Sequence, residues 1–191
     1  MELFKNIRLK IGEAILKKKM AETKRKLYFS NFGQVKKIGI IWDASNVNEF
    51  PYLSKFHQNM NERNIEVNII CFYPDDNLPN QYTAIRYLTC IRKKELNFFY
   101  QPVSIEAQNF IKNRFDVVID INFQQLFPLH YISSLSNSPF KVGLFESETN
   151  NTPYDLMIDM KNPVDVEDYL VQVIKYLEMI NPGQVKQLIN N

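Results

Sequence analysis

Residues 114–145 read RFDVVIDINFQQLFPLHYISSLSNSPFKVGLF, and this stretch decides the fold. The apolar run at 116–121 predicts a buried strand, because the strands of a parallel sheet are covered on both faces. Pro128 then stands in the first turn of an expected helix over 128–136, a position that suits proline. Residues 140–145 form the next apolar strand. A strand, a helix and a strand in this order are typical of a parallel α/β sheet.

The same alternation continues on both sides of this stretch. Further strands are expected at 37–43, 65–73, 96–100 and 154–158. Further helices are expected at 2–26, 50–63, 82–91 and 104–113, with a last long helix that Asn162 caps and Pro163 begins. The pattern predicts one three-layer, Rossmann-like α/β domain over residues 35–191, with a mostly parallel sheet of five or six strands. A basic amphipathic helix and a linker precede it over residues 1–34.

The composition is that of an ordinary globular protein, with 45% hydrophobic and 23% charged residues in a chain of 191. No apolar run approaches the ~20 residues that span a bilayer, and the N-terminus does not read as a secretory signal. The two cysteines, Cys71 and Cys90, lack the spacing of metal ligands. Cys71 lies in an apolar strand, where cysteine acts as a small hydrophobic residue. We expect reduced thiols and a cytoplasmic protein.

The charge is unevenly distributed along the chain. Residues 1–26 hold nine Lys or Arg against three Glu, which leaves 14 basic and 18 acidic residues in the remainder. The body is therefore mildly acidic, and such a surface repels a phosphate backbone. This disfavours nucleic acid as a partner.

The basic N-terminal helix carries Phe4, Ile7, Ile11 and Ile15 at helical spacing. Such a stripe can dock the helix on its own domain or on a second copy in a homo-oligomer, with the lysines left in solvent. The alternative is that the helix lies on a membrane surface or against an acidic protein partner, although its apolar stripe is narrow and lacks tryptophan.

Three strands end in or beside an aspartate, at Asp43, Asp120 and Asp159. Ligands of open α/β sheets bind in the crevice at the carboxyl ends of the strands. Asp and Asn are also common in turns, so each of these residues has a structural reading as well. The predicted ligand crevice consists of Asp43, Ser45, Asn46, Asp120 and Asn122. No residue is assigned a catalytic role.

The segment IIWDASNV at 40–47 resembles the first strand of PIN-like nucleases of the NYN type. That resemblance implies a divalent-metal-dependent phosphodiesterase in which Asp43, Asp116 and Asp120 hold the ion. The chain departs from the family after its later strand, where KVGLFESETNN offers only Glu146 and Glu148.

The sequence contains no motif of another common class of enzyme. The five glycines are never clustered, so neither a Walker loop nor a dinucleotide fingerprint exists, and we expect no cofactor. The two histidines, His57 and His130, have no neighbouring Cys or His in the sequence, which argues against zinc. Each is expected to be a packed or capped imidazole.

Over nearly its full length the chain resembles a family of small bacterial α/β proteins, best known from Bacteroidetes, that is described only as a domain of unknown function. The most specific part is SLSNSPFKVG at 134–143. The N-terminal domain of heptosyltransferase-type glycosyltransferases is a fainter likeness, through Lys141, Val142 and Gly143. That likeness is an analogy of fold, and the chain lacks their second domain. We expect a non-catalytic binding or interaction module.

Overall fold

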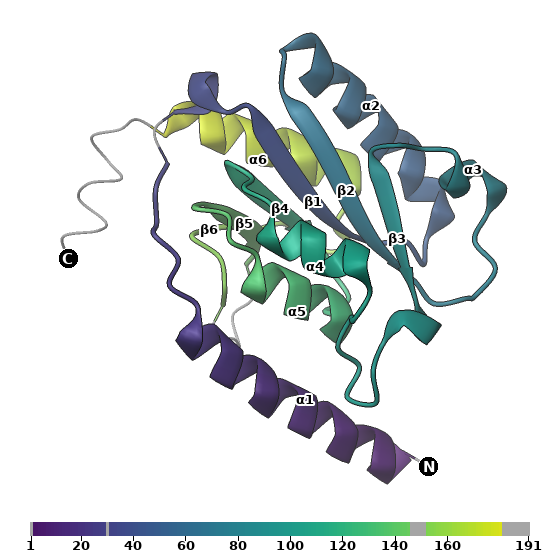
Figure 1. The fold of residues 1–191 in the computed structure, drawn as a ribbon. Coiled ribbons are helices and arrows are strands. Elements are labelled where there is room, and N and C mark those ends of the chain that lie inside the picture. The colour runs from purple at the N-terminus through teal and green to yellow at the C-terminus, as the bar shows by residue number, and fades with distance from the viewer. Residues whose placement is uncertain (1, 30, 146–151, 181–191) are drawn as a thin grey trace.

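One six-stranded sheet runs through the computed structural model, which describes residues 2–29, 31–145 and 152–180 (Figure 1). Its strands are β1 (Lys37–Asp43), β2 (Glu66–Tyr73), β3 (Leu88–Arg92), β4 (Val117–Ile121), β5 (Lys141–Leu144) and β6 (Leu156–Ile158). They lie in the order β3-β2-β1-β4-β5-β6, and every neighbouring pair is parallel. This is the doubly wound order, in which the chain reverses direction across the sheet between β1 and β4.

Helices cover both faces of the sheet, which confirms the predicted three-layer α/β fold (Figure 1). The helices are α1 (Glu2–Glu22), α2 (Phe50–Glu62), α3 (Asn80–Thr83), α4 (Ile105–Lys112), α5 (Phe127–Leu135) and α6 (Val166–Met179). α2 and α6 bury their apolar sides against one face, and α1, α4 and α5 cover the other. The central strand β4 is buried along its whole length, as its sequence predicts.

The helix α1 docks on its own domain, but with a different face from the predicted one. Gly12 and Leu16 are buried, whereas Phe4, Ile7 and Ile11 are exposed. A Cβ atom at Gly12 would collide with the carbonyl oxygen of Phe99, so this glycine allows the helix to approach closely. The stripe that the sequence makes most visible therefore faces outward.

The segment after α1, expected to be a linker up to residue 34, contributes to the hydrophobic core. Phe29, Phe32 and Val35 are buried with the apolar residues of α2 and α6. Arg25 fastens the start of this segment to Asp155 through two hydrogen bonds of 2.6 Å. The linker reading was wrong because the polar residues between these side chains obscured three apolar positions.

Residues 82–100 differ most from the prediction. The expected helix at 82–91 is instead the short helix α3 followed by the strand β3, which pairs with β2 from Leu88 to Arg92. The expected strand at 96–100 is a turn, because the Asn97 side chain accepts hydrogen bonds from the backbone N–H groups of Phe99 and Gln101. Successive aromatic residues imitated a strand here, and the Asn97 side chain organises the loop.

The start of the last helix is also corrected. Asp165, and not Asn162, is the N-cap of α6, and its side chain accepts a hydrogen bond of 3.0 Å from Asp168 N. Asn162 and Pro163 precede the helix and are joined by a cis peptide bond. The Ser104 cap of α4 is confirmed by its hydrogen bond from Ala107 N. Across the described part of the chain, no helix is both long and apolar enough to cross a bilayer.

Candidate functional site

The carboxyl end of β1 begins the candidate site with a tight turn. Asp43 Oδ1 accepts hydrogen bonds from Ser45 N at 3.0 Å and from Ser45 Oγ at 2.6 Å. Such a turn is a common use of aspartate after a strand. Both bonds end on Oδ1, and no described residue is seen to donate a hydrogen bond to Oδ2.

A second set of hydrogen bonds fixes the next side chains. The Glu49 carboxylate accepts from the buried indole of Trp42 and from the amide of Asn46, each at 3.0 Å. Asn46 Oδ1 accepts from Asn48 N at the start of the short 3₁₀ helix Val47–Glu49. These hydrogen bonds hold the side chains of Asn46 and Glu49 in place without a ligand.

These residues line a crevice of about 530 Å³ at the carboxyl end of the sheet. Its further lining comes from the last residues of β4 and β5 and from the segments after β4 and β6: Ile121, Phe123, Gln124, Leu144, Asn162, Pro163 and Val164. The crevice lies where the strand order reverses between β1 and β4, which is where open α/β sheets bind ligands. An apolar floor beside a few fixed polar groups is the usual composition of a small-molecule site.

The charge of the crevice is negative. Asp43 and Glu49 contribute carboxylates, and none of the described residues that line it is Lys, Arg or His. Glu49 is also the N-cap residue of α2, so an acidic side chain stands at the helix terminus. In nucleotide-binding members of this architecture a phosphate occupies that position. The arrangement therefore favours a neutral or cationic ligand over a phosphate.

Asp120 is a buried residue of β4 and does not line the crevice. It is 2% exposed and accepts hydrogen bonds from Tyr154 Oη at 2.7 Å and from Asn122 N at 2.8 Å. Burial raises the pKa of the Asp120 carboxyl, and the hydrogen bonds from Tyr154 and Asn122 oppose that shift. The nearby Ser133 hydroxyl also lowers the pKa of Asp120.

Asn122 has a structural role at the start of α5. Its side-chain oxygen accepts from Leu126 N, and its amide nitrogen donates to Leu126 O. The structure therefore brings Asp43, Ser45 and Asn46 together in the crevice, while Asp120 and Asn122 are used inside the fold. Asp159, after the edge strand β6, is exposed and is not among the residues that line the crevice.

The alternative metal set that the nuclease resemblance implies, Asp43, Asp116 and Asp120, does not form a site. Asp116 lies at the opposite end of the sheet, where Oδ2 accepts from Lys36 N and Lys37 N. The seven residues of β1 separate it from Asp43 by about 20 Å, at roughly 3.3 Å for each residue. Glu146 and Glu148 lie outside the described residues. Within the described ranges no three Asp, Glu, His or Cys side chains are close enough to share a metal ion.

Lys141 is a buried basic residue, which the sequence singled out only through the likeness to glycosyltransferases. Its ammonium group donates to the carbonyl oxygens of Ser133 and Ser134, at 2.7 and 3.0 Å, in the last turn of α5. A cation suits a helix C-terminus. Burial, and then the charge of Arg25, lower the pKa of Lys141 to about 7. The ring of Tyr154 packs where a Cβ atom at Gly143 would lie. Lys141 and Gly143 thus have structural roles.

Both histidines are packed side chains, as predicted. His57 stacks on Tyr87 with ring centroids 3.6 Å apart, and burial lowers its pKa. His130 lies 3.4 Å from the Ser134 hydroxyl, and burial lowers its pKa despite the nearby Asp120 carboxylate. Neither histidine lines the crevice.

The two thiols are neighbours, which their spacing in the sequence does not reveal. Cys71 and Cys90 are partners across β2 and β3, with the sulfur atoms 2.8 Å apart. Burial raises the pKa of Cys71 well above its ordinary value, so its thiolate is scarce at neutral pH. A scarce thiolate disfavours Cys71 as a nucleophile.

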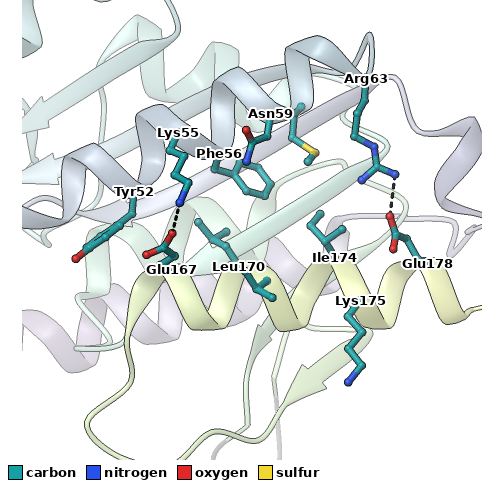
Figure 2. A pocket seen from close by; sticks show the side chains of 12 residues that line it. Tyr52, Lys55, Phe56, Asn59, Arg63, Glu167, Leu170, Ile174, Lys175 and Glu178 are labelled. Carbon is teal, nitrogen blue, oxygen red and sulfur yellow. Dashed lines mark hydrogen bonds and ion pairs between the residues drawn. The ribbon is translucent and has the colours of Figure 1, made fainter.

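A second hollow, of about 460 Å³, lies between α2 and α6 (Figure 2). Two ion pairs cross it, Lys55 with Glu167 at 2.6 Å and Arg63 with Glu178 at 2.8 Å. Phe56, Leu170 and Ile174 form apolar parts of its lining. Because the ion pairs are exposed and the apolar side chains come from two packed helices, this groove reads as a helix interface.

Comparison with known proteins gives a family and no activity. A model described as a family of unknown function (DUF6913) matches residues 8–180. No curated protein matches the chain significantly.

Proposed function

Since the chain belongs to the family of unknown function DUF6913, we propose its function from the crevice: a non-catalytic, cytoplasmic module that binds a small ligand there. The observation that carries this proposal is the crevice at the reversal of strand order, where Asp43 and Glu49 are held by fixed hydrogen bonds above an apolar floor. The charge of the lining sets the ligand class. A neutral polyol or a primary amine offers the hydrogen-bond donors that Asp43 Oδ2 can accept.

The non-catalytic reading is supported by the chemistry of the lining. The described lining holds no His, Cys or Lys, and its two carboxylates, Asp43 and Glu49, already accept hydrogen bonds from Ser45, Trp42 and Asn46. Asp120, Tyr154 and Lys141, whose pKa values are shifted, do not line the crevice and are bound to one another or to backbone. Their pKa shifts follow from burial.

A thermal-shift panel tests the proposal. The full-length protein is heated with neutral polyols, primary amines and, as anionic comparison, nucleotides. A ligand that binds only the folded state raises Tm. We expect polyols or amines to raise Tm and nucleotides to leave it unchanged.

Two matched variants locate the effect. Asp43→Asn keeps an acceptor for Ser45 and so preserves the turn, but removes the charge. Asp159→Asn removes the same charge from another strand end, outside the crevice. The shift should be lost in Asp43→Asn and retained in Asp159→Asn. A shift that is specific to nucleotides, or one that survives Asp43→Asn, would overturn the proposal.

A further inference from the structure

The outward face of α1 carries an unusual row of apolar side chains. Leu3, Phe4, Ile7 and Ile11 are 71, 74, 47 and 41% exposed. The spacing places them on one side of the helix over more than two turns. Exposed apolar residues that occur singly need no explanation, whereas a continuous row indicates a contact with another surface.

The opposite face of the helix is already used, so the row cannot turn inward. Leu16 is buried against α5, and Lys19 Nζ donates to Tyr131 Oη at 2.6 Å. Nearer the N-terminus, Arg8 Nε donates to Phe98 O at 2.7 Å, and the guanidinium lies over the rings of Phe98 and Tyr100. Figure 1 shows α1 as the outermost element on this side of the molecule.

The row lies among positive charges. The exposed lysines of α1 are Lys5, Lys10, Lys17, Lys18 and Lys19, of which Lys19 also bonds to Tyr131. Between residues 3 and 21 the only acid is Glu13. Lysine stems can lie along an apolar surface while their ammonium groups reach a polar layer. A helix of this composition suits an interface between apolar and anionic layers.

We propose that α1 is an interfacial helix that binds the surface of an anionic membrane, with its axis in the plane of the headgroups. The apolar row enters the boundary between headgroups and acyl chains, and the lysines contact anionic lipid. A second copy of this chain is a poorer occupant, because pairing two such faces would bring their lysines together. This inference goes beyond the proposed function and does not depend on the crevice.

Vesicle sedimentation tests it with the full-length protein. Vesicles of phosphatidylcholine with phosphatidylserine should bind the protein, and vesicles of phosphatidylcholine alone should not. Binding should weaken as salt rises, because the attraction between lysines and anionic lipid is screened. The double variant Phe4→Ser/Ile7→Ser should bind roughly tenfold less or worse, since each side chain contributes through burial.

A control variant on α6, which covers the opposite face of the sheet, separates the loss of vesicle binding from a general loss of surface hydrophobicity. Val171 and Met179 on α6 are each 59% exposed, and Val171→Ser/Met179→Ser should bind vesicles as the natural chain does. All these positions are exposed, so Tm should stay unchanged in both double variants. Equal binding by Phe4→Ser/Ile7→Ser, equal loss in the α6 control, or no binding to anionic vesicles would overturn the inference. The natural chain could instead form a dimer in sedimentation analysis, lose it only in Phe4→Ser/Ile7→Ser, and fail to bind vesicles. That result would overturn the inference in favour of a second copy of the chain on this face.

Discussion

The Tyr154 hydroxyl donates a hydrogen bond of 2.7 Å to the buried carboxylate of Asp120. The bond joins the segment before β6 to the middle of the sheet, because Asp120 belongs to β4. The Tyr154 ring meanwhile packs over Gly143 on β5. One tyrosine thus connects three neighbouring strands on the face that α5 covers.

The raised pKa of Asp120 makes stability depend on pH. A carboxyl whose pKa is higher in the folded state binds more protons there, so stability falls as pH rises from its ordinary value of 3.8 through the folded pKa. Urea denaturation at a series of pH values should show this fall in the natural chain. Asp120→Asn should remove it, because no charge is then buried. A difference between the two proteins that is constant over this window would contradict the assignment.

Lys141 gives the opposite slope at higher pH. Its pKa is lowered to about 7 in the folded state from 10.5, so the unfolded chain binds more protons between these values. Stability should therefore rise with pH across this window, by roughly 1.4 kcal/mol for each pH unit between the two pKa values. Denaturation of the natural chain and of Lys141→Met measures the effect as a difference. If the slopes of the two proteins agree, Lys141 is not the titrating group.

The ion pair of Arg25 with Asp155 should stabilise the fold. Its side chains are only 22 and 11% exposed, and Asp155 also accepts from Lys141 N at 2.8 Å. Arg25→Ala should lower the free energy of unfolding by about 2 kcal/mol, since hydrogen bonds between charged groups contribute most when shielded from water.

The pair of Lys55 with Glu167 is the natural control, because both side chains are exposed. Lys55→Ala should leave the stability unchanged within error. The same loss in both variants would show that the shielding of Arg25 and Asp155 is unimportant.

Gly143 is required by the Tyr154 ring. Gly143→Ala would place a Cβ atom inside that ring, so we expect a loss of about 1–3 kcal/mol in urea denaturation. Gly33→Ala is the control, because there the nearest atom is a single side-chain oxygen, of Asn31, at 3.1 Å, and no ring lies against the position. Its effect should stay within about 0.5 kcal/mol. Equal effects at the two positions would contradict the packing argument.

The sequence predicted the sheet where strands are long and buried. β1, β2 and β4 were visible as apolar runs, because a strand covered on both faces has few polar residues. β3 was missed, since its two buried residues, Leu88 and Ile91, lie three positions apart, a spacing that resembles a short helix. The docking face of α1 was missed because it depends on Gly12, whose contribution is the absence of a side chain.

The candidate site was predicted in part for a similar reason. Asp43, Ser45 and Asn46 follow one strand directly, so their common position needs only local structure. Asp120 and Asn122 also lie at the end of a strand, β4, but they bind Tyr154 and Leu126, and the contact with Tyr154 comes from tertiary packing. Glu49 gave no signal, because its role depends on the indole of Trp42 and the amide of Asn46.

The most direct test of the proposed crevice locates the ligand on the protein. Two-dimensional ¹H–¹⁵N NMR spectra are recorded while the panel compound with the largest Tm shift is added to the full-length chain. We predict shifts for the amides of Ser45, Asn46 and Phe123, which lie around the crevice. Shifts confined to the α2–α6 groove at Lys55 and Leu170, or no shifts with any polyol or amine, would contradict it.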